Sequence, residues 1–303
     1  MRLKVLGTAA GGGFPQWNCA CSNCARVREG QFSGTPRTQA QLAWSGVSGE
    51  WTLVNASPDL RVQIEAIPEL WPQNGARNSP IRDVILTGAE VDQVLGLLLL
   101  REFHCFRVHA TPSLRRILTE DNSLFGVLAR FEGQVKWNDL ALDRPCSAGG
   151  ARLEVIALPG AFPGFVNASR RSELNSAEAA IGLLISPESG GATLAFLPGA
   201  GFVSDELLER LEACDFLLFD GTFWSDDEPA RIPGITRTAR QMGHLPISGA
   251  GGSMDRLRSL RRPRKLFIHI NNTNPILDED SAERKMVSES GWEVAQDGME
   301  IAL

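Results

Sequence analysis

The chain has 303 residues and a mass of 32.9 kDa, enough for one large domain or two small ones. Hydrophobic residues make up 43% and charged residues 22%, which is typical of a globular protein and excludes a disordered chain. The formal net charge of −6 argues against nucleic acid as a partner, because nucleic-acid-binding domains are usually basic.

The N-terminal half is expected to begin with strands and then to alternate strands with helices. The first strand, residues 2–6, is too short an apolar run for a secretory signal or for a bilayer span of about 20 residues, so we expect a cytoplasmic protein without a membrane span. Further strands are expected at residues 39–44, 51–55, 81–87 and 107–110, and helices at 57–67, 92–103 and 111–119. Ser57-Pro58 and Thr111-Pro112 each combine a capping hydroxyl with a proline suited to a first helical turn.

The C-terminal half repeats this order. Strands are expected at residues 151–158, 179–186, 192–197, 214–220 and 265–271, and helices at 204–213, 253–262 and 281–290. Two short strands around Asp297-Gly298 are expected to form a hairpin. Because no long linker divides the chain, the pattern predicts one α/β domain over residues 1–303, an αββα four-layer sandwich with helices outside two packed sheets. A doubly wound parallel sheet is the alternative.

Three cysteines are concentrated in the loop that follows the first strand. Cys19, Cys21 and Cys24 are spaced so that a turn can bring their sulfurs to one zinc ion, whose fourth ligand must come from elsewhere in the chain or from solvent. Free surface thiols and a redox site are the alternatives, although clustered exposed thiols oxidise readily. The other cysteines have apolar neighbours and are expected to be buried thiols: Cys105, Cys146 and Cys214.

Polar residues at the ends of apolar strands indicate a second site. Asp220 directly follows an apolar run, His269 alternates with apolar residues, and His244 lies in a loop bounded by glycine and proline. Glu90 and Asp92 follow the strand at residues 81–87, where Asp92 is also suited to cap a helix and Glu90 to lie at the surface. Two imidazoles and one or two carboxylates would suit a mononuclear Fe(II) site or a zinc ion that activates water. The residues alone do not place these groups together, and His269 is equally compatible with a core position.

Stretches from both ends of the chain resemble the PqqB family of pyrroloquinoline quinone (PQQ) biosynthesis proteins, within the metallo-β-lactamase superfamily. These stretches are Gly7–Cys24, Thr87–Glu102, Phe219–Asp227, Met242–Ser253, Phe267–Pro275 and Gly291–Leu303. The resemblance implies a metallo-β-lactamase-like fold. It also implies a role in making PQQ from a ribosomal precursor peptide.

The chain departs from the hydrolases of that superfamily at the metal ligands. Their motif Thr-His-x-His-x-Asp-His corresponds to Thr87–Gln93, where Gly88, Glu90 and Gln93 replace the three histidines and Asp92 is the one ligand that remains. In addition, Gly199-Ala200 stands where a Gly-Asp-Thr turn is expected. Too few ligands remain for a binuclear zinc hydrolase, so β-lactamase or phosphodiesterase activity is not expected. PqqB-like sequences usually have histidine at the position of Gln93, which implies weaker metal binding here.

The resemblance assigns roles to residues of both sites. It implies an active-site metal held by Glu90, Asp92, His244 and His269, with Asp220 as a ligand or base. The cysteine cluster is similar to a zinc knuckle of phosphodiesterase relatives that a late histidine completes. Asn272 stands at that position here, so the fourth ligand of a structural Zn²⁺ is Asn272, water or another group.

Two functions follow from these implications. The first is an iron-dependent hydroxylase, with Fe²⁺ in the active site, that acts on the tyrosine of a Glu-Tyr-derived PQQ precursor. The second is a non-catalytic carrier that binds PQQ or an intermediate and takes part in its transport toward the periplasm. The partners expected are thus small molecules or a dipeptide, without nucleic acid, and the oligomeric state stays open, a homodimer included. Candidate ligand-binding groups, which plain turns or local capping explain equally well, are Gly12, Gly13, Gly251, Gly252 and Asn271.

Overall fold

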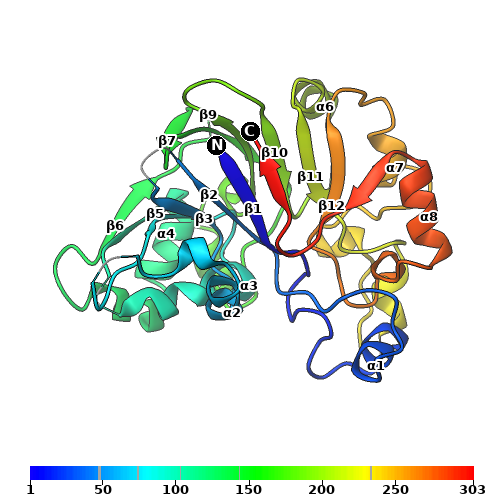
Figure 1. Ribbon diagram of the computed structural model, residues 1–303, viewed down its shortest axis with the longest axis horizontal. Helices are drawn as coiled ribbons and strands as arrows, with labels where there is room; N and C mark the ends of the chain where they lie inside the picture. Colours follow the sequence, from blue (N-terminus) through cyan, green and yellow to red (C-terminus); the bar gives the residue numbers. More distant parts are fainter. Residues whose placement is uncertain (47–48, 74, 103, 143, 233) are drawn as a thin grey trace. The chain divides into compact units, whose positions relative to one another are not determined.

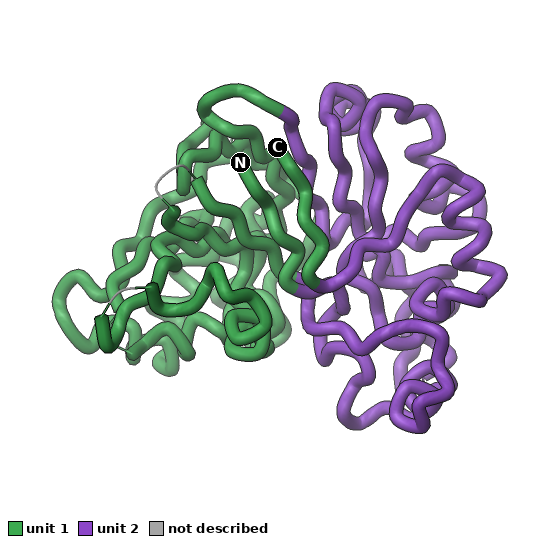
Figure 2. Tube along the Cα trace, in the orientation of Figure 1, with its two compact units in different colours: residues 1–6, 41–191, 298–303 green, residues 7–40, 192–297 purple. Residues whose placement is uncertain are grey.

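The computed structural model describes residues 1–46, 49–73, 75–102, 104–142, 144–232 and 234–303 (Figure 1). Contacts divide the chain into two compact units, each assembled from separate segments (Figure 2). Unit 1 contains Met1–Leu6, Gln41–Gly191 and Gly298–Leu303, and unit 2 contains Gly7–Ala40 and Ala192–Asp297. Neither unit is a continuous stretch of sequence.

Unit 1 is built on a seven-stranded sheet. Along the sheet, its strands are β14 (Glu300–Ala302), β1 (Arg2–Gly7), β2 (Gln41–Ser45), β3 (Trp51–Val54), β4 (Ile81–Ile85), β5 (Phe106–Ala110) and β6 (Val135–Asp139). The pairs β14–β1 and β2–β3 are antiparallel, and β3 to β6 run parallel. The same unit holds the antiparallel strands β7 (Cys146–Ala148), β8 (Ala151–Ala157) and β9 (Ile181–Pro187). These antiparallel pairs exclude the doubly wound parallel alternative.

Short helices accompany the sheets of unit 1, and all of them except α5 and η4 contribute buried residues. They are α2 (Leu60–Glu65), η1 (Pro68–Leu70), α3 (Val91–Val94), η2 (Leu95–Arg101), α4 (Pro112–Thr119), η3 (Ser123–Ala129), α5 (Ala168–Arg171) and η4 (Ser176–Glu178). The core includes Leu53 and Val84 from strands and Leu114 and Ile117 from α4, all fully buried. α4 begins as predicted, with the Thr111 hydroxyl accepting a hydrogen bond from the Leu114 N–H.

Two helices of unit 1 differ from the prediction. The helix expected from Ser57 begins at Leu60, because the Ser57 hydroxyl donates to the Gln63 side chain instead of capping a first turn. The helix expected over residues 92–103 is an α-helical turn followed by a 3-10 segment, and Phe103 lies outside the described residues. The Gly96 N–H donates to the Ala56 carbonyl at 2.8 Å, so it is not used in a continuing α-helix.

Unit 2 contains four parallel strands. In order these are β13 (Trp292–Val294), β12 (Arg264–Ile268), β11 (Phe216–Asp220) and β10 (Leu194–Leu197). Phe267 stacks on Trp292 with ring centroids 4.2 Å apart, and Phe219 meets the same indole edge-on. Because the strands are parallel, the residues after β11 and after β12 lie at the same edge of the sheet.

The helices of unit 2 complete its fold. They are α1 (Ser22–Arg28), α6 (Asp205–Glu212), η5 (Glu228–Arg231), η6 (Arg240–Met242), α7 (Ser253–Arg256), η7 (Pro275–Leu277) and α8 (Ala282–Glu289). The predicted helix over residues 253–262 is therefore much shorter. Cys24 lies on α1 rather than in a loop. Among the described residues, no helix is long and apolar enough to cross a bilayer.

The predicted hairpin at Asp297-Gly298 is wrong. β13 pairs in parallel with β12, whereas β14 pairs antiparallel with β1. Asp297-Gly298 therefore lies between two strands that belong to different sheets. The Asp297 carboxylate is used to hold the N-terminal segment, because it accepts hydrogen bonds from Thr8 and Thr38 at 2.6–2.8 Å.

Candidate metal sites

Three of the predicted site residues meet in unit 2. Asp220 is the last residue of β11, His269 follows β12, and His244 follows η6. One potential ligand atom from each of the three lies within 4.8 Å of the others. His269 has a φ of +59°, a left-handed conformation that few non-glycine residues adopt, and this turn directs the chain away from β12. The structure thus brings together two imidazoles and one carboxylate that are distant in the sequence.

Asp220 is completely buried, and both of its oxygens are used within the protein. Oδ2 accepts from His244 Nδ1 at 2.7 Å and from the Ala200 N–H at 3.2 Å. Oδ1 accepts from the Thr222 N–H at 3.1 Å and from the Thr222 hydroxyl at 2.5 Å. Burial would raise the pKa of this carboxyl, but the adjacent His244 and His269 hold that pKa well below its ordinary value. Asp220 is therefore an ionised group that orients its neighbours.

Thr222 is a site residue that the sequence reasoning missed. Its hydroxyl oxygen lies 2.9 Å from His269 Nδ1 and 3.1 Å from His244 Nδ1. Since the hydroxyl proton of Thr222 is donated to the Asp220 carboxylate, the Thr222 oxygen accepts a hydrogen bond from His269 Nδ1–H. The only sequence signal is its place two residues after Asp220, directly beyond a buried strand.

These contacts set the tautomers of the two histidines. Both Nδ1 atoms face Asp220 and Thr222 and carry the proton, so the lone pair of each ring is on Nε2. The two rings stack with centroids 5.7 Å apart and planes inclined by 23°. Proteins commonly orient metal-binding histidines by a carboxylate on the second ring nitrogen. His244 has that arrangement with Asp220, and His269 has the Thr222 hydroxyl at the corresponding position.

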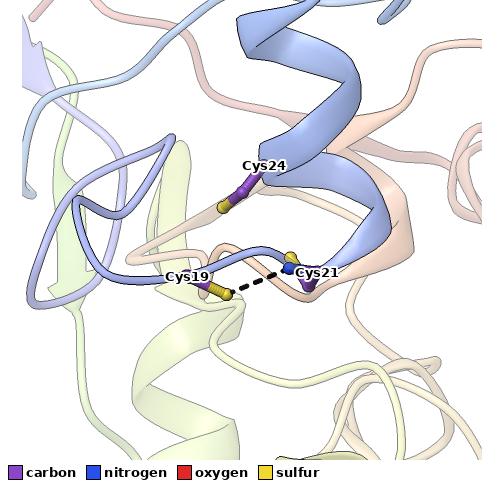
Figure 3. A group of neighbouring side chains, drawn as sticks. All are labelled: Cys19, Cys21 and Cys24. Atoms are coloured by element: carbon purple, nitrogen blue, oxygen red, sulfur yellow. Dashed lines mark hydrogen bonds between the residues drawn. The ribbon is translucent and has the colours of Figure 1, made fainter.

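The cysteine cluster lies in the same unit. Cys24 is on α1, and Cys21 and Cys19 are on the segment that leads into it (Figure 3). The three sulfurs lie within 4.8 Å of one another. Asn272 faces all of them: its side-chain nitrogen is 3.1 Å from Cys19 Sγ, 3.5 Å from Cys21 Sγ and 3.3 Å from Cys24 Sγ. The predicted cluster and its predicted fourth member are therefore neighbours in space.

The thiols of this cluster differ in acidity. Burial would raise the pKa of Cys19, but hydrogen bonds from the Cys21 N–H and from Asn272 lower it below its ordinary value. Burial raises the pKa of Cys21 to about 11, and the neighbouring cysteine sulfurs add to this rise. Ionising all the thiols together requires a cation between them, because thiolates this close repel one another.

The segment after β12 holds Asn272 in place. The Asn23 side chain donates to the carbonyls of Asn272 and Asn274, both at 3.1 Å. Asn274 in turn donates to the Gly221 carbonyl at 2.9 Å, beside Asp220. Asn271 donates to the Thr273 hydroxyl at 2.7 Å, which is the local capping expected for asparagine, and its role in binding a ligand stays a prediction.

Glu90, Asp92 and Gln93 belong to unit 1. Glu90, not Asp92, is the N-cap of α3, and it forms a capping box with Gln93. Gln93 Oε1 accepts from the Glu90 N–H at 3.2 Å, and its Nε2 donates to the Thr87 hydroxyl at 3.4 Å. The Gln93 amide is thus used within its own segment. Asp92 lies in the first turn of α3, and metal ligation by Glu90 and Asp92 stays a prediction.

The predicted glycine N–H donors are used inside the chain. Gly12 donates to the Gln39 side chain, Gly13 to Ala10, Gly251 to the Asp255 carboxylate and Gly252 to Gly249. Binding of a ligand by these groups stays a prediction, and it would compete with these hydrogen bonds. Of the three scattered cysteines, Cys214 is buried as predicted, Cys146 is half-buried and Cys105 is exposed. The prediction of a buried thiol is therefore wrong for Cys105, which lies just before β5 rather than within the sheet.

Comparisons with known proteins show the family of the chain. A family model described as a β-lactamase superfamily domain matches residues 50–270. The chain is 43% identical to coenzyme PQQ synthesis protein B of Methylobacterium sp. (strain 4-46) and 43% identical to that of Azotobacter vinelandii (strain DJ), over the full length of each.

Solved structures give the same result. The Zn²⁺-bound PqqB from Methylobacterium extorquens matches with a TM-score of 0.92 and 41% identity over all of both chains. A diphosphatase from the PhnP family matches with a TM-score of 0.65 and 19% identity, over 99% of this chain and 97% of its own, which shows a shared fold alone. These matches confirm the predicted α/β sandwich of the metallo-β-lactamase type.

Proposed function

The chain belongs to the family of coenzyme PQQ synthesis protein B, within the β-lactamase superfamily, and on this basis we propose that it acts in PQQ biosynthesis as a metal-dependent hydroxylase. Its substrate is proposed to be the tyrosine ring of a Glu-Tyr-derived precursor. The observation that supports the proposal is the cluster of His244, His269 and Asp220, in which both Nδ1 atoms are hydrogen-bonded, so that the lone pair of each ring is on Nε2.

The donor set of this site fits a mononuclear metal. Two neutral imidazoles are common ligands of iron and zinc, and a carboxylate from Asp92 or Glu90 would complete a set with open positions. Asp220 is already used by four hydrogen bonds, so its proposed role is to orient His244 rather than to bind the metal. Fe(II) held by these residues would supply a binding place for dioxygen next to the substrate.

Hydroxylation replaces an aromatic C–H bond by C–OH. One atom of dioxygen enters the ring and the second leaves as water, so two electrons must come from an added reductant such as ascorbate. The protein's part is to orient both imidazoles with Nε2 as the ligand atom. The buried, ionised Asp220 serves this purpose for His244, because it accepts the hydrogen bond from Nδ1 and so fixes the tautomer and the direction of the ring.

The test loads the protein with Fe(II) without oxygen, adds the dipeptide Glu-Tyr and ascorbate, and then admits air. Mass spectrometry should show a product heavier by one or two oxygen atoms. His269→Ala should abolish this product, whereas His104→Ala, a change in unit 1 at a histidine bonded to the Ile81 carbonyl, should leave it unchanged. Equal product with and without protein would contradict the proposed hydroxylase.

For the cysteine cluster we propose a structural Zn²⁺ held by Cys19, Cys21, Cys24 and Asn272. In a tetrahedral site with Zn–S of about 2.3 Å and Zn–O of about 2.0 Å, each sulfur lies about 3.5 Å from the oxygen. The Asn272 amide group lies 3.1–3.5 Å from the three sulfurs, close to that separation. A half-turn about its Cβ–Cγ bond exchanges nitrogen for Oδ1, and the oxygen would then face the metal.

Competition with a zinc chelator tests this ligand set. Asn272→Ala should release zinc at a chelator concentration tenfold or more below that needed for the unaltered protein, because a water must replace the amide oxygen. Asn271→Ala, one residue away, removes only the contact to Thr273 and should leave zinc release unchanged. Equal zinc release from Asn272→Ala and the unaltered protein would exclude Asn272 as the fourth ligand.

Gln93 favours a second candidate function, the non-catalytic carrier. Its amide is used by Glu90 and Thr87, so it adds no donor to a metal site, and fewer donors mean weaker metal binding. A carrier would bind PQQ saturably with equal affinity in the presence and absence of Fe(II). Metal-dependent conversion of Glu-Tyr would exclude the carrier function, and PQQ binding without any turnover would support it.

A further inference from the structure

Unit 1 carries a groove of about 870 Å³ that the proposed function does not use. Its walls come from α2, the segment after η1, the start of β4 and η2. We call this the basic groove and define it by an apolar floor and a cationic rim. The floor is formed by Ile64, Leu70, Leu99 and Leu100, and the rim by Arg61, Arg77, Arg82 and Arg101.

The rim has more positive charge than its surroundings neutralise. Four guanidinium groups line the groove against two carboxylates, whereas the whole chain has a net charge of −6. Within the described residues, the side chains of Arg61 and Arg77 make no hydrogen bond or ion pair. Arg82 and Arg101 contact Glu50 at 3.3 Å and Glu102 at 3.0 Å in solvent-exposed pairs, and such pairs separate easily.

Apolar side chains remain exposed beside this charge. Leu99 is 41% exposed on the floor, and Trp71 is 44% exposed next to Leu70. The Trp71 indole N–H donates to the carbonyls of Ile64 and Glu65 at 3.1 and 3.2 Å, so the ring is fixed against the end of α2. An aromatic ring held in this way provides contact area at low conformational cost, as do the anchor residues of protein interfaces.

We propose that the basic groove binds an acidic, amphipathic peptide segment of a partner protein. The apolar side chains of the segment lie on the floor and beside Trp71, and its carboxylates pair with Arg61 and Arg77. The volume accommodates a few side chains of such a peptide. A concave surface receives side chains, whereas surface binding to a membrane relies on protruding apolar ones, and this favours a peptide over a membrane.

The experiment begins with selection of a displayed library of random 12-residue peptides on the full-length protein. Enriched peptides are expected to combine two or more Asp or Glu residues with Leu, Phe or Trp. Synthetic fluorescein-labelled copies should bind with micromolar Kd by anisotropy, and the double variant Arg61→Glu/Arg77→Glu should weaken binding tenfold or more. Arg152→Glu/Arg258→Glu is the matched control, because it reverses two exposed arginines that do not line the groove and should leave Kd unchanged.

Two further arms complete the test. Raising the salt concentration should weaken peptide binding, and replacing the acidic residues of the peptide by lysine should abolish it. The proposal is overturned if no peptide is enriched, or if the selected peptides bind the Arg61→Glu/Arg77→Glu variant as tightly as the unaltered protein. It is also overturned if only vesicles of phosphatidylglycerol bind through these arginines, which would make the groove a membrane contact. Since the histidine pair takes no part, these outcomes are independent of the hydroxylase proposal.

Discussion

At the scale of single residues, the candidate active site depends on the Asp220 carboxylate, which already accepts four hydrogen bonds within the protein. Asp220 cannot approach a ligand without giving up a donor, so its charge acts through His244 and Thr222. Removing that charge while keeping the shape of the side chain separates the orienting role from the structural one.

We therefore predict that Asp220→Asn lowers the affinity of the protein for Fe(II) by about 10- to 100-fold, as loss of an orienting group on a metal-binding histidine typically does. The amide binds the Nδ1 proton more weakly, so His244 loses its fixed tautomer. Asp205→Asn, an exposed carboxylate on α6, is the control and should leave the affinity unchanged. An Asp220→Asn protein that binds Fe(II) normally would show that the carboxylate does not orient a ligand.

A second buried carboxylate sets the response of unit 1 to acid. Asp83 is 1% exposed and accepts bonds from Arg107 at 2.6 Å and from His109 at 2.7 Å. Burial opposes its charge, but Arg107 and His109 lower the pKa of Asp83 from 3.8 to about 2. Because the pKa is depressed in the folded state, the ionised form stabilises the protein above pH 4, and this contribution is lost as the pH falls toward 2.

The shift of the Asp83 pKa corresponds to about 2 kcal/mol at neutral pH. Asp83→Asn should lower the free energy of unfolding by about that amount at pH 7, with the difference from the unaltered protein shrinking as the pH falls from 4 to 2. Urea unfolding followed at several pH values measures both effects. A difference that stays constant over this range would mean that the ionised carboxylate is not the stabilising group.

Among the residues of the candidate sites, sequence reasoning could find those whose residue type is typical of metal ligands. It could not find residues of ordinary type that only support the ligands. Asp220 and His269 were recognisable from residue type and position at strand ends, and His244 from its place in a loop bounded by glycine and proline. Thr222 was not, because a threonine after a strand is ordinary until the positions of both imidazoles are known. The contacts of Asn272 with three sulfurs likewise depend on the fold, because Asn272 is separated from the three cysteines by 248 to 253 positions in the sequence.

At the scale of elements, α3 shows how a local requirement decides the use of a side chain. Gln93 closes the capping box with Glu90, and Gly88 leaves room for it, since a Cβ on Gly88 would lie 2.2 Å from Gln93 Oε1. Glutamine is well suited to the third position of such a box. The start of α3 is thereby stabilised by Gln93, at the position where PqqB-like sequences usually have histidine.

We predict that Gln93→His trades helix stability for metal affinity. The free energy of unfolding should fall by about 1 kcal/mol as the capping contact is lost. The Fe(II) affinity should rise about tenfold or more if position 93 faces the metal, because an imidazole is a better ligand than an amide. Isothermal titration and urea unfolding measure the two effects. Loss of stability with no gain in affinity would place residue 93 outside the metal site.

Element prediction succeeded where capping chemistry and apolar pattern agreed. α4 begins one residue after the predicted capping residue Thr111, and α6 and α8 begin one residue after Ser204 and Ser281, where helices were expected to start. It failed where another contact took the backbone group or side chain, as at Gly96 and Ser57. The Gly96 N–H donates to Ala56, 40 residues earlier in the chain, and no local pattern encodes that contact, whereas the Ser57 hydroxyl donates to Gln63 only six residues away.

At the scale of the whole molecule, two metal-binding arrangements share one unit built from separate stretches of chain. The N-terminal segment supplies three thiols, and the segments after β11 and β12 supply Asp220, His269 and Asn272. The superfamily fold could be predicted from motifs at both ends of the chain. The interleaving of the two units could not, because composition changes nowhere along the sequence to mark them.

Metal analysis of the purified protein and two variants tests the central claim most directly. The account predicts one zinc and one iron per chain after reconstitution, with zinc lost from Cys21→Ser and iron lost from His269→Ala, each without loss of the other. Retention of iron by His269→Ala, or loss of both metals from either variant while the far-ultraviolet circular dichroism spectrum stays unchanged, would contradict two separate centres at the cysteines and the histidine pair.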